Sequence, residues 1–355
     1  MDGADRITAA RLVVASLGVA PADLLEPSLA GSAPTFAEYI AKVERAVSPG
    51  ARRTYQPYWR LLERVWSGRR LTDPTPTEIK ELANHVQSAA LVRRGSRGGR
   101  SAAEHFIAAT RCLYRHAEID RIISGEQNVA RDVAKPVRLP SLRRALTPGQ
   151  LAAVTAAAAS GGTDPQLDSL LLRLHAETAC RRGGALGIRS QDLDPDQCLV
   201  FLREKAGTSR WQPVSPTLMQ AMIVLERQRG PAGPAAQLLR YRNGRPITRR
   251  RYDSLWSRIG RVHPWVTRQG ISTHWIRHTT LTWVERNFGY AIAEAYAGHT
   301  PRATVPHATS TATYVKATLC EVATALAALT GEQHPLVRVT TPDLDRSSLT
   351  DTVNP

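Results

Sequence analysis

The sequence predicts a mainly α-helical protein with one small antiparallel β-sheet, divided into two domains. Its 355 residues exceed a typical single domain and suit two modest ones. Apolar residues recur at intervals of three and four through most of the chain, a pattern typical of amphipathic helices. Only one segment, residues 198–214, has the strand–turn–strand pattern of a β-hairpin.

The first domain, residues 34–130, is expected to be a bundle of helices. Its first two apolar stripes are Phe36, Tyr39, Ile40 and Val43, and then Tyr55, Trp59, Leu62 and Trp66. Pro74–Thr77 predicts a turn and cap before a third helix at Glu78–Ala89, and a fourth helix is expected at Ala102–Ala117. Residues 1–33 contain prolines and glycines and are expected to form a flexible N-terminal arm.

Two basic segments follow predicted helices, one after the third helix and one after the fourth. The first is a glycine-rich loop whose arginines are candidate contacts to DNA phosphates. A solvated connector is an equally good interpretation of this loop. These arginines are Arg93, Arg94, Arg97 and Arg100. The other segment, residues 131–146, is basic and contains two prolines, as expected of a linker that runs along DNA between two domains.

The second domain is expected to span residues 147–330. Thr147 followed by Pro148 is typical of a helix cap with proline at the first helical position. The hairpin pairs residues 198–203 with 209–214 across a turn that contains Lys205. Residues 331–355 carry prolines and aspartates and are expected to form a mobile C-terminal tail.

The charge of the chain indicates a polyanionic partner. The formal net charge is +16 and the pI is about 10.4, which favours nucleic acid, with acidic membranes or acidic proteins as alternatives. Only five of the 47 basic residues are lysines. Arginine binds phosphate with two parallel hydrogen bonds, which suits a DNA partner, although a GC-rich genome produces the same bias.

Composition also excludes several classes of protein. No run of 18 apolar residues is present, so no transmembrane helix is expected. The N-terminus lacks the basic-then-apolar order of a secretory signal, so we expect a cytoplasmic, nucleoid-associated protein. The four cysteines, Cys112, Cys180, Cys198 and Cys320, form no C-x-x-C pair, which indicates neither zinc site nor disulfide framework.

Five short segments between residues 177 and 314 carry residues suited to phosphate chemistry. The first, Glu177–Leu186, is centred on Arg181, which is expected where one helix ends and the next begins. The second is the hairpin, with Lys205 at its turn and Arg210 on its return strand as a candidate DNA contact. Taken singly, these features also fit an exposed turn and an arginine-rich surface.

The third segment is Thr273–Thr279. Residues three apart share a helix face, so His274 and Arg277 can point at one phosphate. His274 and His278 also have the spacing of a zinc-protease helix, but Trp275 stands where that motif needs glutamate. No metal site is therefore expected.

The last two segments are Ala297–Thr300, which contains Gly298 and His299, and Ser310–Val315, which contains Tyr314. Tyr314 is the candidate nucleophile. The other nearby tyrosine, Tyr296, is expected in the core of a helix.

Together, in this order, the five segments resemble the boxes of the tyrosine recombinase (phage integrase) family. Those boxes read roughly T-G-L-R-x-x-E-L, G-K-G-x-x-x-R-x-x-P-L, H-x-L-R-H-T, L-G-H and S-T-T-x-x-Y. The chain departs from them in two places. Gly184 replaces the acidic residue of the first box, so support for Arg181 must come from elsewhere. Tyr314 lies 15 residues after His299, a longer interval than the family's usual one.

The resemblance implies a helical core-binding domain followed by an α+β integrase-like catalytic domain. It also implies that Arg181 and Arg277 neutralise the phosphate while Tyr314 attacks phosphorus and forms a 3′-phosphotyrosine. His274 would assist Tyr314, Lys205 would protonate the leaving 5′-hydroxyl, and His299 would bond a non-bridging oxygen. No metal, ATP or other cofactor is expected, because cationic side chains supply the charge and the covalent link conserves the bond energy.

The resemblance further implies duplex DNA as substrate and a homo-tetramer assembled from DNA-bound dimers, with accessory DNA-bending or directionality factors as further candidate partners. The reaction would be integration, excision or resolution. The apolar face of Lys316–Leu329 would pack either on its own domain or on a neighbouring protomer. Two alternatives remain: a catalytically inactive DNA-binding protein on the same fold, and a DNA-relaxing enzyme similar to type IB topoisomerases.

Overall fold

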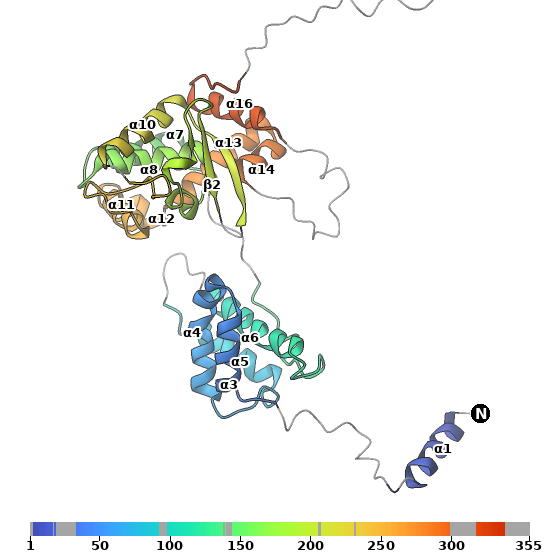
Figure 1. Ribbon diagram of the computed structural model, residues 1–355. Helices are drawn as coiled ribbons and strands as arrows, with labels where there is room; N and C mark the ends of the chain where they lie inside the picture. Colours follow the sequence, from blue (N-terminus) through green and yellow to red (C-terminus); the bar gives the residue numbers. More distant parts are fainter. Residues whose placement is uncertain are drawn as a thin grey trace, which may run out of the picture. The chain divides into compact units, whose positions relative to one another are not determined.

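The chain folds into two compact units, Met1–Pro140 and Ser141–Pro355 (Figure 1). The computed structural model describes residues 3–16, 18, 33–91, 98–137, 139, 144–204, 207–230, 232–298 and 317–337. Helices dominate both units, and a small three-stranded antiparallel sheet lies in the second. The predicted fold class is therefore confirmed.

The described part of the first unit is a helical bundle preceded in the sequence by a separate helix, α1. The helices are α1 (Gly3–Ser16), α3 (Phe36–Ala46), α4 (Pro49–Trp66), α5 (Pro76–Ser88) and α6 (Arg100–Ile119). Helices α3 to α6 pack around one core. The two predicted stripes are buried there, apart from Tyr55, which is half-buried. Thr35 and Thr75 cap α3 and α5 with reciprocal bonds to Glu38 and Glu78, which explains where these helices begin.

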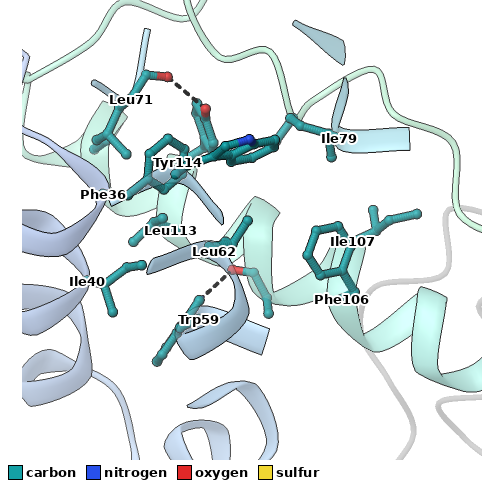
Figure 2. Close-up of a cluster of buried hydrophobic side chains, with 14 of the residues drawn as sticks. Phe36, Ile40, Trp59, Leu62, Leu71, Ile79, Phe106, Ile107, Leu113 and Tyr114 are labelled. Carbon is teal, nitrogen blue, oxygen red and sulfur yellow. Dashed lines mark hydrogen bonds between the residues drawn. The ribbon is translucent and has the colours of Figure 1, made fainter. Parts of the chain in front are cut away.

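Two buried aromatic residues hold this bundle through polar atoms as well as through packing (Figure 2). Trp59 Nε1 of α4 donates a hydrogen bond of 3.0 Å to the Ala109 carbonyl of α6. The Tyr114 hydroxyl of α6 donates one of 2.7 Å to the Leu71 carbonyl, in the loop after α4. Because a buried donor without a partner is costly, these bonds select one register of α4 against α6.

The second unit is built around helix α8. Its helices are α7 (Pro148–Ala159), α8 (Pro165–Thr178), α9 (Arg182–Leu186), the 3₁₀ turn η2 (Ser190–Asp192), α10 (Pro216–Gln228), α11 (Arg249–Val262), α12 (Pro264–Gln269), α13 (Thr273–Phe288), α14 (Tyr290–Ala297) and α16 (Leu319–Thr330). Helix α8 packs against α7, α10 and α13 and is buried along most of its length. The buried Asp168 of α8 accepts hydrogen bonds from Arg251 and Arg258, which tie α8 to α11.

The sheet consists of β1 (Leu193–Asp194), β2 (Leu199–Arg203) and β3 (Ser209–Pro213), in that order. The β2–β3 hairpin was predicted, and it pairs Val200 with Gln212. Strand β1 was not predicted, because two residues carry no alternating pattern and β1 exists only through its pairing with β2. Arg203, at the end of β2, makes a bidentate ion pair with the buried Asp192, at 2.5 and 2.6 Å.

Helix α16 packs on its own unit. Val322 and Leu326 are buried in a cluster with Val284 and Tyr296, whereas Leu319 is partly exposed. Within the single chain, α16 therefore packs on its own domain, and a contact with a neighbouring protomer stays a prediction. Among the described residues, no helix combines the length and apolar content needed to cross a bilayer.

The packing of the first unit predicts a contrast between two positions of α4. Leu62 is fully buried, whereas Val65 is 49% exposed. Leu62→Ala should lower the free energy of unfolding by about 2–5 kcal/mol, because it removes buried methyl groups and leaves a cavity. Val65→Ala should change it by less than about 0.5 kcal/mol. Urea titration followed by tryptophan fluorescence measures both, and equal losses would contradict the packing described.

Candidate active site

Arg181 lies at the junction between α8 and α9, as the sequence predicted. Helix α8 ends at Thr178, and Ala179 then adopts a left-handed backbone with φ of 49°. Arg181 is the N-cap of α9 and has an extended backbone. This sharp turn directs the chain from the centre of the second unit to its surface, where the Arg181 side chain is 36% exposed.

A buried histidine holds the turn before Arg181. His175 Nδ1 lies 3.0 Å from the Cys180 carbonyl, and its Nε2 lies 2.9 Å from the Tyr252 hydroxyl. Since a carbonyl only accepts, Nδ1 carries the proton and Nε2 accepts from Tyr252. Burial lowers the pKa of His175 to about 4, so the imidazole is neutral at pH 7. The neutral His175 side chain thereby holds the Cys180 carbonyl, directly before the candidate catalytic residue Arg181.

Arg277 links this turn to the end of α14. Its guanidinium is buried in α13, and Nη1 donates to the Ala179 carbonyl while Nη2 donates to the Ala297 carbonyl at 2.9 Å. Burial, and after it the nearby charge of Arg181, lowers the pKa of Arg277 to about 10. The group therefore stays cationic at neutral pH.

Arg181, His274 and Arg277 line one open pocket of about 590 Å³. His274 is exposed in the first turn of α13, one turn before Arg277, so the predicted shared face is present. The full lining is Cys180, Arg181, Arg182, Gly183, Arg249, Asp253, Trp256, Ser272, Thr273, His274 and Arg277. Four arginines against one aspartate make this pocket strongly basic.

The carboxylate of Glu204 supports the arginines, although Glu204 was not among the site residues predicted from the sequence. Its side chain is inaccessible to solvent at the end of β2. Oε1 accepts from the Arg181 backbone N–H at 2.6 Å, and Oε2 accepts from Arg181 Nη1 at 2.6 Å and from Arg210 Nη1 at 3.2 Å. Burial by itself raises the pKa of Glu204, but the Arg181 N–H bond and the surrounding guanidinium groups outweigh it and keep this pKa below its ordinary value. Glu204 is therefore ionised.

A signal for Glu204 was present in the sequence. It is an acidic residue next to Lys205, in a chain whose first box lacks its usual carboxylate. The pairing itself joins positions 23 residues apart and becomes visible only in the fold.

Arg210 lies inside the same cluster. Its side chain is 15% exposed, and Nη2 donates to the Tyr296 carbonyl at 3.2 Å. Its guanidinium also covers Gly298, where an added Cβ would come within 2.1 Å of Arg210 Nη1. Gly298 has φ of 63°, a left-handed backbone that favours glycine, and a side chain there would also displace the Arg210 guanidinium. A DNA contact from Arg210 stays a prediction.

The described residues do not include all the candidates. The following candidates lie outside them: Lys205, His299, Tyr314, Arg93, Arg94 and Arg97. Arg100 is described and is exposed at the first position of α6. In the described ranges, no group of three or more His, Cys, Asp or Glu side chains is placed to hold a metal ion.

Tyr296 was predicted to lie in a helix core, and this is confirmed. Its ring is fully buried in α14, and its hydroxyl donates to the Glu177 carbonyl. Burial raises the pKa of Tyr296 far above its ordinary value.

Comparison with known proteins decides the family. Residues 144–313 match the model of the phage integrase family. The chain is also 30% identical over 259 residues to tyrosine recombinase XerD of Mycobacterium tuberculosis (strain CDC 1551 / Oshkosh), a match that covers 68% of this chain and 80% of that protein. The chain belongs to the phage integrase family of tyrosine recombinases. It is an enzyme of site-specific recombination that cleaves and rejoins DNA.

Solved structures show the same fold for this recombinase. A lambda integrase tetramer bound to a Holliday junction aligns with a TM-score of 0.57 at 16% identity, over 87% of this chain and 90% of that one. The Tn1549 transposon integrase in complex with circular intermediate DNA aligns with a TM-score of 0.58 at 18% identity, over 79% of this chain and 98% of that one.

The buried His175 predicts how the stability of this recombinase depends on acid. Its folded pKa of about 4 lies below the ordinary 6.5, so the unfolded state binds more protons in this range. The free energy of unfolding should therefore fall as the pH drops from 6.5 to 4, by on the order of 3 kcal/mol from this group.

His175→Asn keeps a donor for the Cys180 carbonyl but does not titrate in this range. Denaturant titrations at a series of pH values should show a shallower acid loss for His175→Asn than for the wild type. His105→Gln, at an exposed position of the first unit, serves as the control. Parallel curves for wild type and His175→Asn would show that His175 is not buried as a neutral group.

Proposed function

We propose that this recombinase cuts and rejoins duplex DNA through a covalent 3′-phosphotyrosine at Tyr314. The observation that supports this is the convergence of Arg181 and Arg277, from different helices, on one basic pocket that also contains His274. The helix caps and buried contacts described above hold both arginines in place before any DNA is bound.

The charge of the pocket suits the transition state of phosphoryl transfer. A phosphodiester carries one negative charge, and attack by an oxygen nucleophile adds charge to the non-bridging oxygens. Guanidinium groups bind such oxygens with two parallel, charge-assisted hydrogen bonds. Because Arg181 and Arg277 are already positioned in a partly water-excluded site, they stabilise the developing charge without reorganising.

The remaining roles follow the order of the family boxes. The Tyr314 oxygen forms a bond to phosphorus as the bond to the 5′-oxygen breaks. His274 assists removal of the phenol proton, since a tyrosine with a pKa near 10 is mostly protonated at neutral pH. Lys205 gives a proton to the leaving 5′-oxygen, and His299 bonds a non-bridging oxygen. A 5′-hydroxyl from a second strand then reverses these steps and rejoins the DNA.

Duplex DNA and further copies of this chain are the proposed partners. The net charge of +16 favours DNA, and the helical first unit and basic residues 131–146 would extend the contact along it. The lambda integrase structure is a tetramer bound to a Holliday junction, and by analogy we expect a tetramer of DNA-bound dimers. The proposed domain limits are those of the sequence analysis, with residues 147–330 as the catalytic domain.

Covalent capture tests the proposed nucleophile. Duplexes tiled across the DNA that flanks the gene are nicked so that a cleaved strand loses a short fragment and cannot be rejoined. Wild type should leave a protein–DNA adduct on a denaturing gel, and Tyr314→Phe should leave none. Tyr290→Phe removes a hydroxyl from a side chain that is 68% exposed, and it should retain the adduct.

The same assay separates the alternatives. Wild-type protein that binds these duplexes without ever forming an adduct would be the inactive DNA-binding protein. Relaxation of any supercoiled plasmid, with no preferred site, would indicate the topoisomerase-like activity.

Arg181→Lys tests the role of the guanidinium. The substitution keeps the charge but loses the planar fork, so single-turnover adduct formation should slow by on the order of 10²-fold. DNA affinity should change by only a few fold, as for the control Arg242→Lys, whose side chain is 69% exposed. A rate loss that excess DNA restores would assign Arg181 to DNA binding and not to the transition state.

A further inference from the structure

The start of helix α9 lacks one of its own capping groups. Arg181 is the N-cap and Gly184 is the third residue of the helix. A glutamate at this third position commonly reaches back to the N–H of the N-cap residue. Glycine has no side chain to do so, and the Arg181 N–H donates instead to Glu204 Oε1 at 2.6 Å. The capping carboxylate therefore comes from the end of β2.

Glu204 also occupies the space that a side chain at position 184 would need. A Cβ added at Gly184 would lie 3.2 Å from both Glu204 Cγ and Glu204 Oε1. These contacts are tighter than ordinary van der Waals distances, so one of the two groups would have to shift by a few tenths of an ångström. Positions 184 and 204 therefore compete for one place beside Arg181.

The sequence contains the matching exchange. The first family box has an acidic residue where this chain has Gly184. The family hairpin has a glycine directly before its lysine, where this chain has Glu204 before Lys205. Relative to those patterns, glycine and glutamate have changed places between helix α9 and the residue that follows strand β2. In this chain the carboxylate beside Arg181 is carried by position 204, whereas the family pattern carries its acidic residue at the position of Gly184.

The cluster needs this carboxylate for electrostatic reasons. Arg181 and Arg210 both donate to Glu204, and the positive charge of Arg277 is close enough to interact with Arg181. Without an anion these cations would repel one another in a partly buried site, where removing one partner of an ion pair is strongly unfavourable. Arg181 has a 36% exposed side chain and would then turn toward solvent.

We propose that Glu204 is the positioning residue of the arginine cluster. Directly after β2, it does what a glutamate at position 184 would do from α9. Its two bonds to Arg181, one to the backbone and one to the guanidinium, hold that side chain toward the pocket. Because the Glu204 N–H donates to the Thr208 carbonyl at 2.7 Å, Glu204 also ties Arg181 to the β2–β3 hairpin. The effect of Glu204 on catalysis rests on the proposed function. The competition between side chains at positions 184 and 204 for the same space beside Arg181 does not.

A double-mutant cycle tests whether side chains at positions 184 and 204 compete for the same space beside Arg181. Glu204→Gly should slow adduct formation by on the order of 10²-fold, because it leaves the arginines without their anion. Gly184→Glu should also slow it, because two carboxylates crowd one site. The double variant Gly184→Glu/Glu204→Gly restores one carboxylate, and its rate should return to within about tenfold of wild type.

A second variant separates charge from shape. Glu204→Gln keeps the size of the side chain and removes its charge, so it should also slow cleavage at saturating DNA while leaving DNA affinity within a few fold. Glu285→Gln makes the same chemical change at an exposed position of the same unit and should cleave like wild type. A rate for Glu204→Gln equal to that of wild type would overturn the positioning role.

Thermal unfolding of the free protein supplies a readout that needs no catalysis. Each single substitution of the cycle should lower Tm, and the double variant should recover most of the loss. A double variant no better than the worse single variant, in both Tm and rate, would overturn the shared place. If wild type forms no adduct on any duplex, the proposed function fails, and the Tm cycle still decides whether 184 and 204 share one place.

Discussion

The geometry of the site depends on one buried cation, the guanidinium of Arg277. A buried charge requires partners, and Arg277 finds them in the carbonyls of Ala179 and Ala297. Ala179 precedes Arg181 by two residues, and Ala297 precedes His299 by two. A single side chain of α13 therefore sets the spacing between two backbone segments that lie far apart in the sequence. The same guanidinium lines the basic pocket.

A second constraint is the balance of charge around that cation. Arg181 and Arg210 converge on the carboxylate of Glu204, which is inaccessible to solvent and ionised. Three guanidinium groups and one carboxylate leave the cluster strongly positive, as the proposed phosphate site requires. The carboxylate also limits repulsion between the cations in the free protein. The Arg210 guanidinium lies against Gly298, in the place where a side chain at position 298 would begin. Polar groups already oriented for the substrate are the general basis of electrostatic catalysis.

Much of the architecture could be predicted because its causes are local. The apolar stripes of α3 and α4 follow from helical periodicity, and Thr147 and Pro148 mark the start of α7 as capping rules require. The β2–β3 hairpin follows from an apolar strand, a glycine-containing turn and a return strand. Strand β1 could not be found in this way, because its two residues are extended only where they pair with β2. The helix formed by residues 3–16 was likewise missed, in a segment expected to be a flexible arm.

The sequence by itself determined which residue types are present and in what order, and hence the family resemblance, the positions of most helices and the candidates Arg181, His274 and Arg277. Only the tertiary structure decided that the carboxylate of Glu204, directly after β2, lies beside Arg181, that Arg210 is enclosed in the cluster, and that α16 packs on its own unit. The physical reason is the range of the interactions. Helix periodicity and caps are set within one turn of chain, whereas ion pairs and shared volumes depend on segments that only folding brings together.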